Sequence, residues 1–221
     1  MYNYDECVLT GCDEKSSWQL EWFCDNYHKH NLGLPVVLCD FGLSAETREK
    51  YAHRFSGVMD LSKNELQGWF KKPIAMFHSP AKKTLWLDTD CEVKDSLSAL
   101  MKLIVPGKLN MVEDKPWTKR RGEVWHNSGV VGVIGRPEIL HNWCKAVTAK
   151  PEVGDQEVLH SLLNPITRMT YINDLPFEWN VMRLATDHDD YKGPIKIQHH
   201  TGEKGKEKIK GLMKIKEVIN G

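Results

Sequence analysis

Residues 82–93 read Lys-Lys-Thr-Leu-Trp-Leu-Asp-Thr-Asp-Cys-Glu-Val, and this stretch decides the predicted fold. Thr84 to Leu87 is a short apolar run with charged residues on both sides, which is typical of a strand buried on both faces of a sheet. Because ligands of open α/β sheets bind beyond the carboxyl ends of the strands, we expect Asp88 and Asp90 to face a ligand. Two carboxylates so spaced can converge on one hard cation, which can bind a diphosphate in turn. A single aspartate there would more often form a turn or cap a helix, but the pair favours a site.

The composition narrows the class of protein. The chain has 221 residues with 30 basic and 30 acidic side chains, so its net charge gives no argument for binding nucleic acid or an anionic surface. We expect one domain over residues 1–221. No secretory signal begins the sequence and no apolar run has the length of a membrane span, which predicts a cytoplasmic protein, with peripheral contact to a membrane as the alternative. Six cysteines without a Cys-x-x-Cys pair favour buried reduced thiols over disulfides or zinc.

Strand-like and helix-like segments alternate before the 84–87 run. Apolar strands are expected at 6–10, 35–39 and 57–60, and helices from about 16, over 45–55 and over 73–78. This alternation predicts an α/β fold with a mostly parallel central sheet flanked by helices. The ends of the first two strands are a plausible nucleotide edge because of their position alone. The sequence lacks a Gly-x-Gly-x-x-Gly after the first strand and a P-loop, which argues against the usual dinucleotide-binding and P-loop domains.

The rest of the chain is less regular. Helices are expected over 97–103, over 137–147 and from 154 onward, with strands near 110–112, over 130–134 and over 195–200. A polar loop before residue 126 holds Lys119, Arg120 and Arg121, which form either a solvated face or a contact for an anionic acceptor or nucleic-acid phosphate. A Lys-rich helix over about 205–221 is expected to pack on the domain, and contact with a membrane surface is the alternative.

Five landmarks in a fixed order resemble those of GT-A fold glycosyltransferases, above all the retaining enzymes of glycosyltransferase family 8 and related α-mannosyltransferase-like enzymes. The landmarks are Lys72-Pro73 with the later Asp88-Thr89-Asp90, His126-Asn127-Ser128-Gly129-Val130, Gly154-Asp155-Gln156-Glu157, Leu175-Pro176-Phe177-Glu178-Trp179-Asn180, and His199-His200-Thr201-Gly202. Two positions depart from the family pattern. Glu157 is the third residue of the Asp-Gln-Asp stretch, and the lysine three residues after Gly202 is replaced by Gly205, which Lys204 and Lys206 flank.

The resemblance implies a metal-dependent enzyme with a GT-A, Rossmann-like domain that moves a sugar from a nucleoside diphosphate sugar to an acceptor hydroxyl with retention of configuration. Asp88, Asp90 and His199 would bind Mn²⁺ or Mg²⁺, which would stabilise charge on the departing diphosphate. Asn127, Asp155 and Gln156 would face the sugar as catalytic residues. The residues expected to bind the rest of the donor are Thr10, Gly11, Cys12, Asp13, Asp40, Lys72, Thr89, Gly202, Lys204 and Lys206.

The substrates are predicted only as classes. We expect a UDP-sugar as donor, with a GDP-sugar as the alternative. A glycan, a lipid-linked glycan and nucleic acid are the acceptor classes, in falling order. Residues 117–125 and 177–179 are expected to contact the acceptor, because aromatic rings stack on sugar or base faces and arginines bind anions.

Two other function classes compete. Haloacid-dehalogenase-type phosphatases also place Asp-x-Asp after an apolar strand, with the first Asp as nucleophile, and Asp189-Asp190 could serve as their late carboxylates. Their motif normally lies on the first strand, whereas three predicted strands precede it here. The third class is a nucleotide-sugar-binding module without catalysis.

Overall fold

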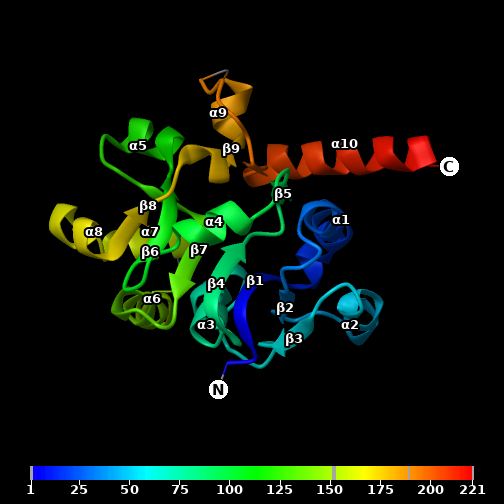
Figure 1. Ribbon diagram of the computed structural model, residues 1–221, viewed down its shortest axis with the longest axis horizontal. Helices are drawn as coiled ribbons and strands as arrows, with labels where there is room; N and C mark the ends of the chain where they lie inside the picture. The colour runs from blue at the N-terminus through cyan, green and yellow to red at the C-terminus, as the bar shows by residue number, and fades with distance from the viewer. Residues whose placement is uncertain (1, 151–152, 189, 221) are drawn as a thin grey trace.

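The computed structural model describes residues 2–150, 153–188 and 190–220, and these form an α/β fold around a twisted sheet (Figure 1). Among them, seven strands are arranged in the order β3-β2-β1-β4-β7-β6-β8. These strands are β1 (Tyr4–Cys12), β2 (Val36–Asp40), β3 (Gly57–Asp60), β4 (Ala81–Leu87), β6 (Leu109–Glu113), β7 (His126–Ile134) and β8 (Ile172–Asp174). Strands β3, β2, β1 and β4 are parallel, and β7 is antiparallel to both of its neighbours, β4 and β6. The predicted α/β class with a mostly parallel sheet is confirmed.

Alternating side chains bury both faces of the sheet. Val8 and Leu85 are partners in the register of β1 and β4 and pack on one face, whereas their neighbours Leu9 and Trp86 pack on the other. The first face is covered by α1 (Leu20–His30), α4 (Ser98–Leu103) and the start of α10 (Gly202–Asn220). The second face is covered by α3 (Lys71–Phe77), α6 (Glu138–Ala149) and α7 (Asp155–Ser161). The central run from Thr84 to Leu87 is therefore buried on both sides, as predicted.

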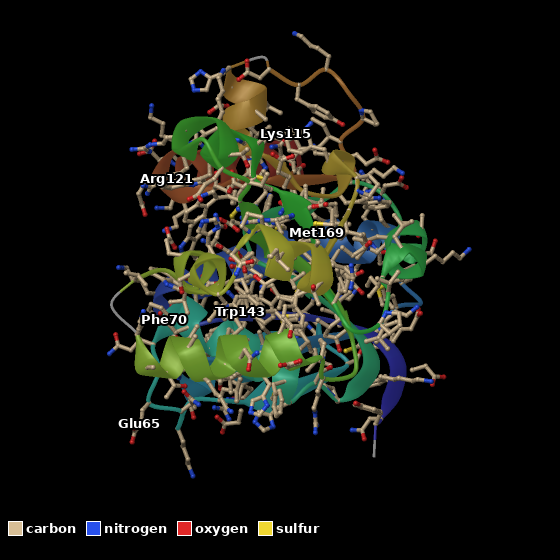
Figure 2. All side chains as sticks on the ribbon, turned by 90° about the vertical axis from the view of Figure 1, so that its left-hand side faces the viewer. Glu65, Phe70, Lys115, Arg121, Trp143 and Met169 are labelled. Atoms are coloured by element: carbon tan, nitrogen blue, oxygen red, sulfur yellow. The ribbon has the colours of Figure 1, made fainter. Side chains whose placement is uncertain are left out.

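A second, smaller sheet lies beyond the end of β4. Its strands are β5 (Cys91–Val93), β10 (Ile197–His199) and β9 (Val181–Met182), with β10 in the middle. The remaining helices are α2 (Ala45–Ala52), α5 (Lys115–Arg121), α8 (Pro165–Tyr171) and α9 (Arg183–Asp187), and short 3₁₀ turns span Glu14–Gln19, Gly68–Phe70 and Phe177–Trp179. In the side view α5, α8 and α6 lie one above another, marked by Arg121, Met169 and Trp143 (Figure 2). Strand β10 carries the late histidines to the region beyond β4.

Several predicted boundaries were wrong for local reasons. The polar loop before residue 126 is largely the helix α5, because the Asp114 carboxylate accepts a hydrogen bond from Trp117 N and Gly122 ends the helix with a φ of 73°. The strand expected over 130–134 begins earlier, because residues 126–129 also belong to β7, whose pairing with β6 continues past a bulge. The helix expected from about residue 16 starts as the 3₁₀ turn Glu14–Gln19, which Asp13 caps. The final helix begins at Gly202, and residue 221 lies outside the described part.

Two other sequence predictions can be compared with the structure. All six cysteines lie in the described part of the chain, and each is buried with a free thiol, as predicted. Among the described residues, no helix combines the length and the apolar character needed to cross a membrane.

Candidate functional site

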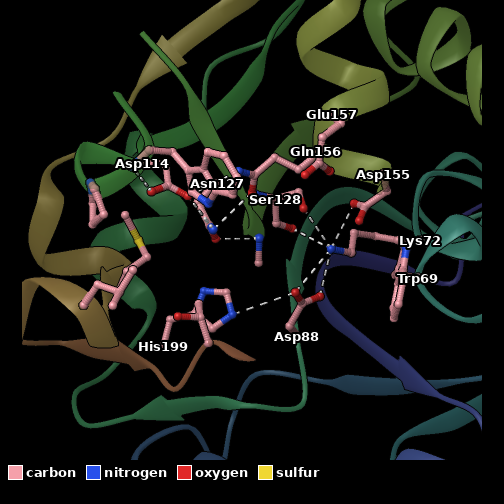
Figure 3. A pocket seen from close by; sticks show the side chains of 16 residues that line it. Trp69, Lys72, Asp88, Asp114, Asn127, Ser128, Asp155, Gln156, Glu157 and His199 are labelled. Carbon is pink, nitrogen blue, oxygen red and sulfur yellow. Dashed lines mark hydrogen bonds and ion pairs between the residues drawn. The ribbon is translucent and has the colours of Figure 1, made fainter. Parts of the chain in front are cut away.

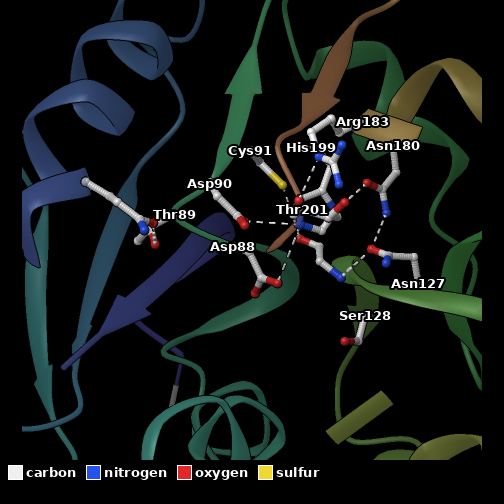
Figure 4. A network of polar contacts seen from close by, with 12 residues as sticks. Asp88, Thr89, Asp90, Cys91, Asn127, Ser128, Asn180, Arg183, His199 and Thr201 are labelled. Carbon is white, nitrogen blue, oxygen red and sulfur yellow. Dashed lines mark hydrogen bonds and ion pairs between the residues drawn. The ribbon is translucent and has the colours of Figure 1, made fainter. Parts of the chain in front are cut away.

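The two aspartates after β4 lie beside His199. The Asp88 N–H donates to the Gly129 carbonyl at 2.9 Å, which fixes the turn that follows β4 against β7. Strand β5 then pairs antiparallel with β10, and this register places His199 opposite Cys91. His199 Nε2 lies 3.1 Å from Asp90 Oδ1 and 4.0 Å from Asp88 Oδ2 (Figure 4). Pairing between strands that are far apart in sequence thus assembles the three predicted metal ligands.

A pocket of about 280 Å³ opens at this edge of the sheet (Figure 3). Residues just after β4 and at the start of β7 line its base, and residues of α3, α5 and α7 line its sides. The residues that line it are Trp69, Lys72, Asp88, Asp114, Pro116, Trp117, Asn127, Ser128, Gly129, Asp155, Gln156, Glu157, Met182, Leu184, His199 and Thr201. Six of the predicted site residues, from four separate landmarks, therefore meet in one cavity: Lys72, Asp88, Asn127, Asp155, Gln156 and His199.

Lys72 is a buried cation between two carboxylates. Its side chain is 2% exposed, and its ammonium lies 3.0 Å from Asp88 Oδ1 and 3.1 Å from Asp155 Oδ2. It also donates to the Ser128 carbonyl at 3.0 Å and to the Ser128 hydroxyl at 3.1 Å. Burial acts to lower the pKa of Lys72, but Asp155 and Asp88 raise it by more, so the ammonium stays charged. Burial also raises the pKa of Asp155, and the charge of Lys72 opposes this rise only in part.

The side chains that could hold a cation are grouped around Asp90 and His199. Burial acts to lower the pKa of His199, but the adjacent Asp90 carboxylate gives a net rise. Burial likewise acts to raise the pKa of Asp90, and His199 gives a net fall. Among the described residues, the Asp90, Cys91 and His199 ligand atoms lie within 4.8 Å of one another, so the Cys91 thiol joins this cluster. Asp88 is turned toward Lys72 and also accepts a hydrogen bond from Trp86 Nε1 at 2.6 Å.

Buried amides connect the sugar-facing residues predicted from sequence. Gln156 Oε1 accepts from Asn127 Nδ2 and from Ser128 N, both at 3.1 Å. Gln156 Nε2 and Asn127 Nδ2 both donate to Asp114 Oδ2, at 3.2 and 3.1 Å. On the other side of Asn127, Asn180 is fully buried and bridges to His199. The amide planes of Asn127 and Gln156 are therefore fixed in one orientation.

The predicted nucleotide edge lies at the ends of β1 and β2 rather than in this pocket. In the part of the chain that the structure describes, the pocket lining includes none of Thr10, Gly11, Cys12, Asp13 and Asp40. Asp40 is fully buried, accepts from the backbone N–H groups of the next turn, and forms an ion pair with a helix arginine. Its carboxylate shapes the loop after β2. Asp13 caps the turn before α1.

Four other residues predicted to bind the donor, Thr89, Gly202, Lys204 and Lys206, are also not among the described residues that line the pocket. The Thr89 hydroxyl donates to a buried glutamine of the turn before α1 at 2.6 Å. Gly202 has a φ of 73° at the start of α10, a conformation that favours glycine. Lys204 is exposed, and Lys206 forms an ion pair with Glu203. A Cβ at Gly205 would lie 1.9 Å from the His200 carbonyl oxygen, so close packing of α10 excludes any side chain there.

Sequence reasoning gave no role to four residues of the site, although Asn180 ends one of the five landmarks. Asp114 and Asn180 hold the amides, Cys91 lies beside the imidazole, and Trp69 lines the pocket while 60% exposed. Asp114 follows β6 as Asp88 follows β4, so the rule about strand ends could have found it. The orientation of Asn180 depends on contacts that no local pattern encodes.

Aromatic and basic side chains lie together at one rim of the pocket. Trp117 lines the pocket and stacks on Trp125 with ring centroids 5.6 Å apart. The His160 ring stacks on Trp125, with ring centroids 3.7 Å apart. The guanidinium groups of Arg120 and Arg121 lie 5.2 and 4.7 Å from the Trp117 ring centroid. The predicted acceptor segment thus carries an organised aromatic and cationic surface at the pocket rim.

Solved structures with this arrangement of strands and helices are glycosyltransferases. The galactosyltransferase LgtC, solved with donor and acceptor sugar analogues, is 16% identical over 89% of this chain and 87% of its own, with a TM-score of 0.60. GlyE of Streptococcus pneumoniae is 18% identical with a TM-score of 0.70, over 91% of this chain, which spans only 55% of GlyE. Mouse xyloside xylosyltransferase 1 is 15% identical over 88% of this chain and 97% of its own, with a TM-score of 0.55.

In comparisons of sequence, neither a protein-family model nor a curated protein matches the chain. The three likenesses rest on the course of the backbone over nearly the whole chain. This chain therefore has the GT-A fold of the glycosyltransferases, as its five landmarks predicted.

Proposed function

We propose that this protein transfers a sugar from a nucleoside diphosphate sugar to an acceptor hydroxyl with the help of Mn²⁺ or Mg²⁺. One observation carries the proposal. Asp88 and Asp90, in the turn after β4, lie beside His199 of β10, and Asp88 and His199 line a pocket that also holds Asp155 and Gln156. The GT-A fold supports the same activity, since each of the compared structures is a glycosyltransferase.

The donor set fits a hard divalent ion. Carboxylate oxygens and one imidazole suit Mn²⁺ or Mg²⁺, and the separations of 3.1 and 4.0 Å leave room for one ion between His199 and the two carboxylates. When bound, such an ion supplies positive charge for the diphosphate that leaves the sugar. Asp90 would hold the ion through the oxygen that faces the imidazole, and Asp88 would hold it through Oδ2, which lies on the His199 side of its carboxylate.

The other pocket residues bind and orient the donor. Lys72 holds Asp88 and Asp155 in place at the pocket wall through its two ion pairs. The Asp155 carboxylate lies where a positively charged sugar centre would be stabilised, and Asn127 and Gln156 hold their amides rigidly beside it. Both hydrogen bonds to Gln156 Oε1 fix the direction of its amide dipole. We propose retention of configuration because the sequence landmarks resemble those of retaining enzymes. We favour a UDP-sugar, with a GDP-sugar as the alternative.

The acceptor binds at the rim formed by α5. Trp117 offers a ring face to a sugar, and Arg120 and Arg121 offer charge to an anionic group. A glycan or a lipid-linked glycan fits this surface better than nucleic acid, because the ring nearest the cavity is suited to one sugar face.

A thermal-shift and turnover series tests this function. UDP with Mn²⁺ at about 100 times its dissociation constant should stabilise the protein by about 2.7 kcal/mol, and GDP should do so less. Incubation with UDP-sugars should release UDP slowly, and Asp88→Asn, Asp90→Asn and His199→Ala should each abolish this release. His200→Ala is the matched control, because its imidazole pairs with Glu92 instead.

The outcomes separate the competing classes. A nucleotide-sugar-binding module would show the thermal shift without release of UDP. A phosphatase would hydrolyse a generic phosphate ester with Mg²⁺, but the Asp-x-Asp follows β4 rather than a first strand, Asp190 is exposed, and Asp189 lies outside the described residues. Absence of any shift with nucleoside diphosphates, or full activity in excess chelator, would contradict the proposed function.

A further inference from the structure

A chain of hydrogen bonds between side chains connects Asp114 to His199 through two asparagines. Figure 3 shows Asp114 and Asn127, and Figure 4 shows Asn127, Asn180 and His199. Asn127 Nδ2 lies 3.1 Å from Asp114 Oδ2, and Asn127 Oδ1 lies 2.9 Å from Asn180 Nδ2. Asn180 Oδ1 in turn lies 3.0 Å from His199 Nδ1. Asn180 is fully buried, so water cannot replace either of its partners.

The two groups at the start of this chain fix its direction. Asp114 accepts hydrogen bonds at both carboxylate oxygens, Oδ1 from the Trp117 backbone N–H and Oδ2 from Asn127, so the Asn127 atom facing it is the NH₂ group. The backbone N–H of Gly129 can only donate, and it lies 2.9 Å from the other side-chain atom of Asn127, which must be the oxygen. The orientation of the Asn127 amide, which electron density seldom distinguishes, is therefore determined by its partners.

The same reasoning then reaches the imidazole. Because Asn127 presents an oxygen, the Asn180 atom facing it must be the NH₂ group, and Asn180 must present its own oxygen to His199. An amide oxygen only accepts, so His199 Nδ1 must carry a proton. In the neutral imidazole, Nε2 is then the atom with the free lone pair, and this is the atom beside Asp90 and Asp88.

Gly129 restricts the ring from another side. A Cβ at this position would lie 2.1 Å from His199 Cε1, so the imidazole lies directly against the glycine backbone. A ring held between Gly129 and the Asn180 oxygen cannot flip about its Cβ–Cγ bond without losing the hydrogen bond, because the flip would put Cδ2 where Nδ1 lies.

We propose that Asn180 is a positioning residue that sets the tautomer and ring orientation of His199, and so prepares Nε2 as a metal ligand before any ion binds. The inference deepens the proposed function and rests on it for the metal. Partners that fix the second nitrogen of a metal-binding histidine are a general requirement for affinity. Asn180 does not touch the ion in this role. Asp114 and Gly129 fix the orientation of the Asn127 amide, and Asn127 fixes that of Asn180. Asn180 therefore presents its oxygen to the imidazole.

The first experiment reads the tautomer in the wild-type protein without metal. Long-range ¹H–¹⁵N correlation of the histidine rings, at a pH where His199 is neutral, distinguishes a proton on Nδ1 from one on Nε2. His199→Gln assigns the signal by its loss. We expect the Nδ1–H form. A predominant Nε2–H form overturns the inference, and this result does not depend on whether any variant folds.

The second experiment measures Mn²⁺ affinity from the free-ion signal in electron paramagnetic resonance. Asn180→Leu removes the acceptor for Nδ1–H, so the Nδ1–H preference should disappear and Mn²⁺ should bind about 10- to 100-fold more weakly. Asn180→Asp keeps an acceptor for His199 but loses the donor to Asn127, so the tautomer and at least wild-type Mn²⁺ affinity should remain. Urea unfolding of both variants measures any general loss of stability.

The results separate this inference from the proposed function. A merely structural role for Asn180 predicts that both variants lose Mn²⁺ affinity alike, and that outcome refutes positioning. Unchanged affinity in Asn180→Leu refutes it as well. If the wild type has the Nδ1–H tautomer but binds no Mn²⁺ even with UDP present, the proposed metal site fails while the tautomer assignment stands.

Discussion

Replacement of Lys72 by methionine tests whether the pocket is held together by one buried charge. The ammonium is the shared partner of Asp88 and Asp155, and its side chain is 2% exposed. Methionine keeps the length and much of the volume of the side chain, so the change removes charge and hydrogen bonds rather than packing. The two carboxylates then face each other without a cation.

The expected cost follows from the burial of the two partners. Breaking a buried ion pair by removing one member costs about 3–5 kcal/mol, because the other charge stays buried. Asp155 is only 9% exposed and carries most of this cost, whereas Asp88 is 28% exposed and is partly solvated. The pKa of Asp155, already raised by burial, should rise further in Lys72→Met. Asp155→Asn in the same chain should restore at least half of the lost stability.

Urea unfolding of a double-mutant cycle measures this coupling. Lys72→Met should lower the midpoint by about 1–2 M, given urea slopes of about 2–3 kcal/mol/M for a chain of this size. Lys71→Met is the matched control on the same helix. Its ammonium is also buried, but the described contacts are the carbonyls of Phe41 and Leu61 rather than carboxylates. We therefore expect Asp155→Asn to rescue Lys72→Met and to be additive with Lys71→Met.

A loss below about 1 kcal/mol in Lys72→Met would refute this reasoning, because it would mean that water already solvates the two carboxylates. So would equal coupling of Asp155→Asn to both lysine variants.

Three further predictions follow from single contacts. Gly129→Ala places a Cβ where the His199 ring lies, so Mn²⁺ binding measured by paramagnetic resonance should weaken at least about tenfold while circular dichroism stays unchanged. The pKa of Asp25 is lowered by its two cationic partners, against the effect of burial, so its stabilisation is present above the unfolded pKa of about 3.9 and is lost as the pH falls. Asp25→Asn should therefore destabilise the protein at pH 7 and much less at about pH 3 in urea titrations; an equal loss at both would contradict the assignment. Arg120→Ala with Arg121→Ala should raise the KM for an anionic acceptor and leave slow donor hydrolysis intact, whereas equal loss of both activities would place these arginines at the diphosphate.

The sequence by itself determined the strands of the parallel half of the sheet and the acidic edge of the site. Local composition favours a strand at Gly57–Asp60 and in the apolar run that ends at Leu87, and both segments are strands. A strand buried on both faces ends where charged residues begin. Asp88 and Asp90 follow the carboxyl end of β4, which is the edge where open α/β sheets generally bind their ligands. The order of the landmarks added the GT-A fold, which the backbone confirms.

Only the tertiary structure decided which groups face one another at that edge. His199 reaches Asp90 because β5 and β10 pair in one register, and a shift by one residue would turn its ring to the opposite face. Lys72 lies between Asp88 and Asp155 because α3 packs on the same sheet face as α7. The direction of the Asn180 amide depends on donors and acceptors from the turn after β6, from β7 and from β10. Local propensity acts over a few neighbouring residues, whereas register, side-chain direction and hydrogen-bond polarity are set by partners that meet only after the chain has folded.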